Sequence, residues 1–203
     1  MATSSYLFLG TPVSMEDDPT TGAKVPLIKL VGDSGASIID SEVGGLIVVD
    51  SVHHEVHEGI TFQTSYASGS VANSGNLDLV ISTTGTTLTS HVSWSVSSGG
   101  DADIYFYEGV TGTYGTEIEG VNLNRQSSNT PEVQVFTNPS ISILGLLLHR
   151  EHLPGGFGPS SPGGVTRRNT EWILANNQRY LLRATNIAGT AQPMSINFQW
   201  YED

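Results

Sequence analysis

Apolar and polar side chains alternate with a period of two along much of the chain, most clearly near the C-terminus. There the apolar Met194, Ile196, Phe198 and Trp200 interleave with Ser195, Asn197, Gln199 and Tyr201. Successive side chains of a β-strand point to opposite faces, so the pattern predicts a strand with one buried face. Similar alternation or short apolar runs predict strands at 60–66, 77–81, 92–96, 102–106, 133–136, 141–148, 172–174 and 180–185.

Clusters of Gly, Asn, Ser and Pro separate these strands, at 67–69, 73–75, 97–100 and 154–164. Such residues favour turns, and the Pro-Gly-rich stretch at 154–164 predicts a long exposed loop. A helical period extends over no more than two turns anywhere, and no repeat of 20–50 residues is visible. We therefore predict an all-β fold, an antiparallel β-sandwich or jelly roll.

The first 45 residues differ from the rest of the chain. Short apolar stretches at 6–9 and 25–31 are joined by an acidic, turn-forming connector at 15–22. We predict an N-terminal arm or outlying hairpin at 1–45 and a β-sandwich domain at 46–203. Because so few apolar side chains cannot offset about 1–2 kcal/mol of backbone ordering per residue, we expect the arm to become ordered against a neighbouring subunit or shell.

The composition narrows the classes of partner. Eight Lys and Arg against twenty Asp and Glu give a net charge of −12, which repels phosphate backbones, so nucleic-acid binding is not expected. The chain has no cysteine, which excludes disulfides, thiolate metal sites and a cysteine nucleophile. The start lacks the pattern of a secretory signal, and no apolar run approaches the ~20 residues of a membrane span, so we expect a protein made in the cytoplasm.

Histidines and glutamates are densest at 53–58, where His53, His54, Glu55, His57 and Glu58 offer possible metal ligands. On a strand, His53, Glu55 and His57 would share one face, and two imidazoles with a carboxylate suit zinc or nickel. A hydrogen-bonded cluster or a subunit contact explains the same residues, so we expect no metal or other cofactor and keep these three as the candidate ligands. The remaining histidines, 91, 149 and 152, would complete a site only if the fold gathered them.

Two patterns suggest catalysis. The string Gly32-Asp33-Ser34-Gly35 is similar to the nucleophile turn of chymotrypsin-like serine proteases, but there the serine follows its histidine and aspartate, whereas here it precedes almost the whole chain. Glu117 and Glu119 would suit glycoside hydrolysis, but two acids at i and i+2 are typical of a solvated strand edge. Gly-rich phosphate loops are missing from the sequence. We therefore predict a surface turn, a solvated edge and a protein that is not an enzyme.

Three tyrosines suggest a possible carbohydrate-binding function. Tyr105, Tyr107 and Tyr114 would form a platform for stacking sugar rings if the fold brought them together. Packing across strands or within a subunit interface would use the same tyrosines.

Several strings resemble the head decoration (cement) proteins of tailed bacteriophages. They are Val49-Asp50-Ser51, 54–59 with Phe62, 105–109, Asn124-Arg125, Glu171-Trp172-Ile173-Leu174 and 180–186, spread over about residues 50–200. The chain departs from the pattern after Asn124-Arg125, where Gln126 and Ser127 replace a second basic residue. The resemblance implies a β-sandwich that stacks on a capsid lattice, generally as a symmetric oligomer, and it transfers no catalytic residues.

We therefore expect a virion structural protein that decorates and stabilises the outer surface of a phage capsid by binding the major capsid protein lattice. A carbohydrate-binding or receptor-binding module of a head fibre or tail is the alternative. The apolar run at 143–148 and the many strand aromatics exceed what one small sandwich readily buries, so we also expect a homo-oligomer, specifically a trimer.

Overall fold

The computed structural model describes the backbone of residues 5–8, 11–17, 24–27, 39–40, 45–46, 51–155, 163–166 and 171–203, and the side chains of 53–155 and 171–203. The chain divides into two compact units, residues 1–50 and 51–203. The division follows Asp50. The boundary predicted from the sequence, after residue 45, would instead cut through a pair of strands formed by residues 39–40 and 45–46.

Unit 1 contains two small antiparallel sheets. One has the order β1-β2-β3, formed by β1 (Ser5–Phe8), β2 (Thr11–Asp17) and β3 (Lys24–Leu27). The other pairs β4 (Ile39–Asp40) with β5 (Gly45–Leu46). The two apolar stretches of the predicted arm thus begin in β1 and β3. Clasping of a neighbour by this unit stays a prediction.

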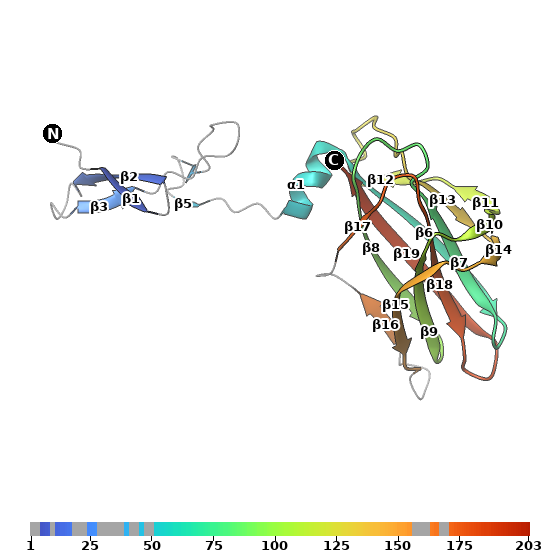
Figure 1. Ribbon diagram of the computed structural model, residues 1–203. Helices are drawn as coiled ribbons and strands as arrows, with labels where there is room; N and C mark the ends of the chain where they lie inside the picture. The colour runs from blue at the N-terminus through green and yellow to red at the C-terminus, as the bar shows by residue number, and fades with distance from the viewer. Residues whose placement is uncertain are drawn as a thin grey trace. The chain divides into compact units, whose positions relative to one another are not determined.

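Unit 2 opens with the helix α1 (Ser51–Glu58), followed by strands. The described strands are β6 (Thr61–Val71), β7 (Asn76–Ser82), β8 (Ser90–Ser98), β9 (Ala102–Glu108), β10 (Thr111–Thr113), β11 (Thr116–Ile118), β12 (Val121–Asn122), β13 (Gln134–Thr137), β14 (Ser140–Ile143), β15 (Leu146–Leu153), β16 (Gly163–Thr166), β17 (Trp172–Leu174), β18 (Arg179–Asn186) and β19 (Gln192–Glu202). The prediction of an antiparallel, all-β sandwich is confirmed (Figure 1).

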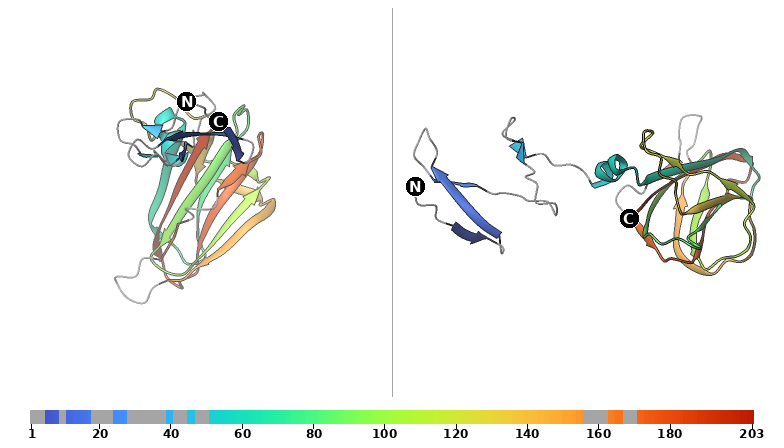
Figure 2. Two further views of the ribbon diagram at one scale, coloured as in Figure 1. Left: turned by 90° about the vertical axis from the view of Figure 1, so that its left-hand side faces the viewer. Right: turned by 90° about the horizontal axis from the view of Figure 1, so that it is seen from above.

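Two sheets form the sandwich. The β19 sheet has the order β12-β6-β19-β8-β16, with β17 also paired to β8, and the β18 sheet has the order β11-β13-β7-β18-β9-β15. With β6, β7, β8, β9, β15, β16, β18 and β19 numbered 1–8 in chain order, the sheets read 1-8-3-6 and 2-7-4-5. This is the strand order of a jelly roll, and a view from above shows the strands around a common interior (Figure 2).

Aromatic rings join the two sheets in the core. Trp94 of β8 and Phe106 of β9 have ring centroids 4.6 Å apart, and Phe106 stacks on Tyr180 of β18 at 5.6 Å. Each fully buried side chain of this size stabilises the fold by roughly 1.5–3 kcal/mol. The alternation predicted for the last strand is confirmed, since Met194, Ile196, Phe198 and Trp200 are all buried.

A buried carboxylate ties the two sheets together at one end. Glu202 of β19 is 3% exposed and accepts hydrogen bonds from the backbone N–H groups of Glu132 (2.8 Å) and Val133 (3.0 Å) and from Trp200 Nε1 (2.8 Å). Residues 132 and 133 lead directly into β13 of the β18 sheet. Three donors satisfy this charge, as a buried carboxylate requires.

The predicted strand at 141–148 is in fact two strands, β14 and β15. Gly145 has a φ of +75°, and a Cβ atom there would collide with the carbonyl oxygen of Glu108. The chain turns at this glycine because other residues rarely adopt such a φ. The alternation also missed the short strands β10, β11 and β12, and β16 begins inside the predicted 154–164 loop.

The helix α1 ends in a Schellman motif. Gly59 has a φ of +73°, its N–H donates to the carbonyl of Val56, and the N–H of Ile60 donates to the carbonyl of Glu55. These two bonds satisfy carbonyls that have no partner within the helix. In the described part of the chain, no helix has the length and apolar character needed to cross a bilayer.

Candidate functional site

The outer face of the β19 sheet is polar and uncharged over its central strands. Its half-buried or exposed residues form cross-strand rows, Ala67–Ser195–Ser97, Ser65–Asn197–Ser95 and Gln63–Gln199–Ser93. Direct contacts within the rows are hydrogen bonds, such as Ser97 Oγ to Ser195 Oγ at 2.6 Å. Small neutral side chains of this kind are typical of a solvated face.

The outer face of the β18 sheet is graded from apolar to polar across three rows of strand partners. The rows are Val80–Leu181–Tyr107–Leu147, Asp78–Arg183–Tyr105–Arg150 and Asn76–Thr185–Asp103–His152. Large, charged and aromatic side chains therefore collect on this face of the sandwich, and we consider it the candidate interaction surface.

The charged row is a chain of ion pairs and stacked rings. Arg183 donates from Nε and Nη2 to the two carboxylate oxygens of Asp78, at 2.9 and 2.7 Å, and this hydrogen-bonded partner raises the pKa of the guanidinium. Tyr105 stacks on Tyr107 at 5.9 Å, and the guanidinium of Arg150 lies 5.4 Å from the Tyr105 ring. A two-point Arg–carboxylate pair holds its geometry better than a single contact.

Asp103 connects the charged row with the polar row. Its carboxylate accepts hydrogen bonds from His152 Nδ1 (3.0 Å), Arg150 Nη2 (2.9 Å) and the Tyr105 hydroxyl (3.0 Å). Burial opposes the charge, but these three donors outweigh it, so the pKa of Asp103 lies below its usual value of 3.8. The aspartate is therefore ionised at neutral pH and orders the β9–β15 edge.

A small second core covers part of the apolar row. Val80, Val110 and Leu181 are buried, with half-buried hydrophobic residues packed against them. These are Tyr107, Tyr114, Phe136 and Ile141. The two-stranded β10–β14 sheet supplies Ile141, and Arg179 lies 4.6 Å from the ring of Tyr114. The insertion between β9 and β15 thus acts as a partial lid on the outer face.

Next to the second core, a group of aliphatic side chains is exposed to solvent. Ile143 and Leu146 are 62% and 63% exposed, and Leu144 and Leu147 are 36% and 46% exposed. We call these four residues the apolar edge. They flank the Gly145 turn, and β15 is the terminal strand of its sheet in the described structure. Clustered exposed aliphatic residues on a terminal strand are typical of a surface that a protein partner covers.

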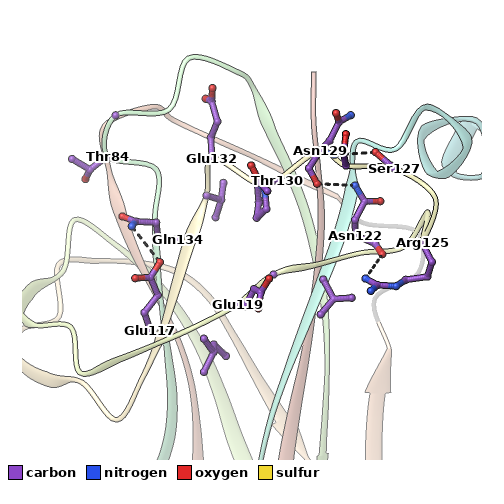
Figure 3. A pocket seen from close by; sticks show the side chains of 17 residues that line it. Thr84, Glu117, Glu119, Asn122, Arg125, Ser127, Asn129, Thr130, Glu132 and Gln134 are labelled. Carbon is purple, nitrogen blue, oxygen red and sulfur yellow. Dashed lines mark hydrogen bonds between the residues drawn. The ribbon is translucent and has the colours of Figure 1, made fainter.

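A polar pocket of about 830 Å³ lies at the end of the sandwich, among residues 117–134 with Thr84 and Gly85 (Figure 3). Glu117 and Gln134, hydrogen-bonded at 3.3 Å, lie on one side, and Asn122 and Arg125 lie on the other. Glu119 also lines the pocket, so the fold places both predicted acids at one cavity. Both glutamates are exposed, as predicted for a solvated edge.

The tyrosine platform does not form as one surface. Tyr105 and Tyr107 stack on each other, but Tyr114 packs against Phe136 at 5.0 Å and against Arg179. Tyr107 and Tyr114 are both half-buried against the second core. Tyr107 and Tyr114 are therefore used mainly for packing against apolar neighbours on the outer face, whereas the Tyr105 hydroxyl donates to Asp103.

The strand geometry expected for His53, Glu55 and His57 is wrong, because residues 51–58 form α1. On a helix, residues two apart point to opposite sides, so Glu55 does not join the two histidines. His53 and His57, four apart, do meet, with their Nε2 atoms 3.0 Å from each other. The other side brings together His54, Glu55 and Glu58. Gly59 as a helix stop was the sequence signal for this helix.

Each of the other histidines has a carboxylate neighbour of its own. His91 lies between Glu171 (2.5 Å) and Asp203 (3.2 Å), His149 contacts Glu151 (3.5 Å), and His152 contacts Asp103. These contacts explain the three imidazoles without gathering them at the α1 cluster.

The strings that carry the resemblance to decoration proteins include several core positions, whereas Val49 and Asp50 lie outside the described residues. Phe62 and residues of β9, β17 and β18 are buried in the core, and Asn124 Nδ2 donates to the carbonyl of His57 at 3.0 Å. Arg125 Nη1 contacts the carbonyl of Asn122 at 3.5 Å. The string Gly32–Gly35 lies outside the described residues.

No family model matches the chain, and a search of curated proteins finds no significant match.

Proposed function

We propose that the protein is a non-enzymatic structural component of a virion, which decorates and stabilises the outer surface of a tailed-phage capsid by binding the major capsid protein lattice. Support comes from the sequence resemblance, from a jelly-roll topology of the kind found in viral capsid domains, and from an acidic, cysteine-free chain. The apolar edge is the observation that carries a role in assembly, because it leaves large aliphatic side chains without cover.

A second copy of the chain is the proposed occupant of the apolar edge. In a trimer the contact is heterologous: the apolar edge of one copy, which includes the first two residues of β15, meets a different surface of the next copy. Repeated about a symmetry axis, such a contact closes a homo-oligomer, which we propose to be a trimer.

Light scattering at micromolar concentration tests the oligomer. We expect the mass of a trimer for the natural chain and a shift towards monomer for Leu146→Ser combined with Leu147→Ser. The matched control is Ile173→Ser, which removes an equally exposed side chain (64%) from β17 of the other sheet. A monomeric natural chain, or an oligomer that survives the double substitution unchanged, would contradict the role of the edge.

Capsid binding is tested separately, by co-sedimentation of the purified protein with phage capsids that lack their decoration protein. Stoichiometric uptake at the capsid surface is expected. Failure to bind any such capsid, together with a signal on a glycan array, would replace the proposal by its alternative.

That alternative is a carbohydrate-binding or receptor-binding module of a head fibre or tail, and the polar pocket favours it. Carboxylate, amide and guanidinium groups line the pocket, and these are groups that hydrogen-bond sugar hydroxyls. Its described lining contains no aromatic ring, so a glycan would be held by hydrogen bonds alone. Arg125→Ala and Glu119→Gln should abolish a glycan signal that arises there and leave capsid uptake unchanged.

A further inference from the structure

We infer that His53 and His57 form a binding site for a first-row divalent metal ion of the zinc, nickel and copper class. The two imidazoles project from successive turns of α1, and their Nε2 atoms lie 3.0 Å apart. Their ring centroids are 4.5 Å apart, with an interplanar angle of 79°. The site is independent of the proposed assembly function.

The separation of the two nitrogens matches a chelate. Two nitrogens that are each about 2.0–2.1 Å from one ion lie about 2.9 Å apart at a right angle and about 3.3 Å apart at a tetrahedral angle. The observed 3.0 Å falls in this interval. Borderline ions of this class prefer imidazole, whereas magnesium and calcium prefer oxygen ligands, so the donor set selects the class of metal.

A hydrogen bond between the two rings explains the pair less completely. It requires one Nε2 to carry the single proton of a neutral imidazole while the other accepts. Both histidines are exposed, so water competes for each nitrogen and the bond contributes little to stability. A divalent ion takes the place of the shared proton and uses both lone pairs at once.

The surroundings favour a cation. The chain has a net charge of −12, and Glu55 and Glu58 lie on the same helix. These acids interact with His54, whose Nε2 lies 3.4 Å from Glu58 Oε1 and whose Nδ1 lies 3.9 Å from Glu55 Oε1. They contribute negative potential without occupying the His53–His57 pair. Water completes the coordination, because the pair itself supplies two ligands.

Binding would also fix the helix. A helix of eight residues is marginal by itself, and a metal bridge between positions i and i+4 spans one of its turns. Because α1 is the first element of unit 2, the ion would stabilise the start of that unit.

Calorimetric titration of untagged, chelator-treated full-length protein with Zn²⁺, Ni²⁺ and Cu²⁺ tests the site. We expect one ion per chain with micromolar affinity, weakened at least about tenfold by His53→Ala or His57→Ala, because each variant loses the chelate. His54→Ala and His152→Ala are matched controls and should change the affinity less than about twofold. Hydrogen exchange should show greater protection of the α1 amides with zinc in the natural chain and in the controls, but not in His53→Ala.

The side chains of His53 and His57 are exposed, so their replacement should preserve the fold, which circular dichroism verifies. The inference is overturned if no ion binds below millimolar concentration, or if binding survives His53→Ala and His57→Ala. Loss of binding in His54→Ala or Glu58→Gln, with retention in the two other variants, would also overturn it by moving the site to the opposite side of α1.

Discussion

The two outer faces of the sandwich carry different kinds of side chain, although the strands of both sheets alternate in the same way. On the β19 sheet the outward residues are mostly serine, asparagine and glutamine, with no charged side chain in the rows described above. On the β18 sheet they form an apolar row, a row of ion pairs and a polar row, with exposed aliphatic residues at one edge. The β19 face is typical of a solvated surface, and the β18 face is the one that we propose to meet a partner, although both sheets bury an apolar inner face.

Leu181 and Leu182 test whether the outer cover of the β18 sheet is as rigid as the core. Both are fully buried, but Leu182 belongs to the main core and Leu181 to the second core under the β10–β14 insertion. We expect Leu182→Ala to lower the free energy of unfolding by roughly 3–5 kcal/mol and Leu181→Ala by roughly 2–3 kcal/mol. The smaller loss at Leu181 is expected because the two-stranded β10–β14 sheet that packs there can shift into the cavity.

Denaturant unfolding followed by tryptophan fluorescence measures both leucine variants. All three tryptophans, Trp94, Trp172 and Trp200, lie in unit 2 and report on the sandwich alone. Equal losses for the two variants would show that the outer cover is packed as firmly as the core.

Glu202 tests the connection between the two sheets. Glu202→Ala removes the acceptor of three hydrogen bonds and leaves buried N–H groups unsatisfied, so we expect a loss of about 2–4 kcal/mol in unfolding free energy. Glu202→Gln retains one carbonyl oxygen and should lose less. A loss below about 1 kcal/mol for the alanine variant, measured by the same denaturant titration, would mean that water replaces the carboxylate.

Asp103 tests the charged part of the outer face through pH. Asp103→Asn should lower the free energy of unfolding by about 1–2 kcal/mol at neutral pH, because three donors lose a charged acceptor. The folded pKa lies below 3.8, so the stabilisation is present above pH 3.8 and is lost as the pH falls through the folded value. The difference between Asp103→Asn and the natural chain should therefore shrink in acid.

Ser95→Ala, on the uncharged outer face, is the control for this experiment. It should change stability by less than about 0.5 kcal/mol at any pH. A pH-independent difference between Asp103→Asn and the natural chain would contradict the assignment of the lowered pKa.

The smallest effect on folding is expected at the apolar edge. Leu146→Ser should change the unfolding free energy of the monomer by less than about 0.5 kcal/mol, because the side chain is 63% exposed. Unfolding at nanomolar concentration, where an oligomer dissociates, isolates this quantity. A loss of several kcal/mol at that dilution would show that the edge packs within its own subunit.

Much of the fold was predictable because the alternation of apolar and polar residues within each strand shows which of its faces is buried. Alternation located β6, β7, β8, β9, β18 and β19, and the turn clusters between them predicted a sandwich or jelly roll. Short strands such as β10, β11 and β12 were missed because two or three residues are too few to show a period. The helix α1 was missed because its two turns have few apolar positions and its Gly59 stop signal was not used.

The sequence by itself determined the fold class, the acidic charge, the absence of disulfides and the apolar run that became the exposed edge. Only the tertiary structure decided which strands are partners, and therefore that Asp103 meets Arg150 and His152 from a strand 47 and 49 residues away in the chain. It also showed that, of the three candidate metal ligands His53, Glu55 and His57, only the two histidines lie together. The direction of a side chain depends on whether the local backbone is helix or strand, and contacts across strands depend on the topology of the sheet. The spacing of residues along the sequence determines neither of them.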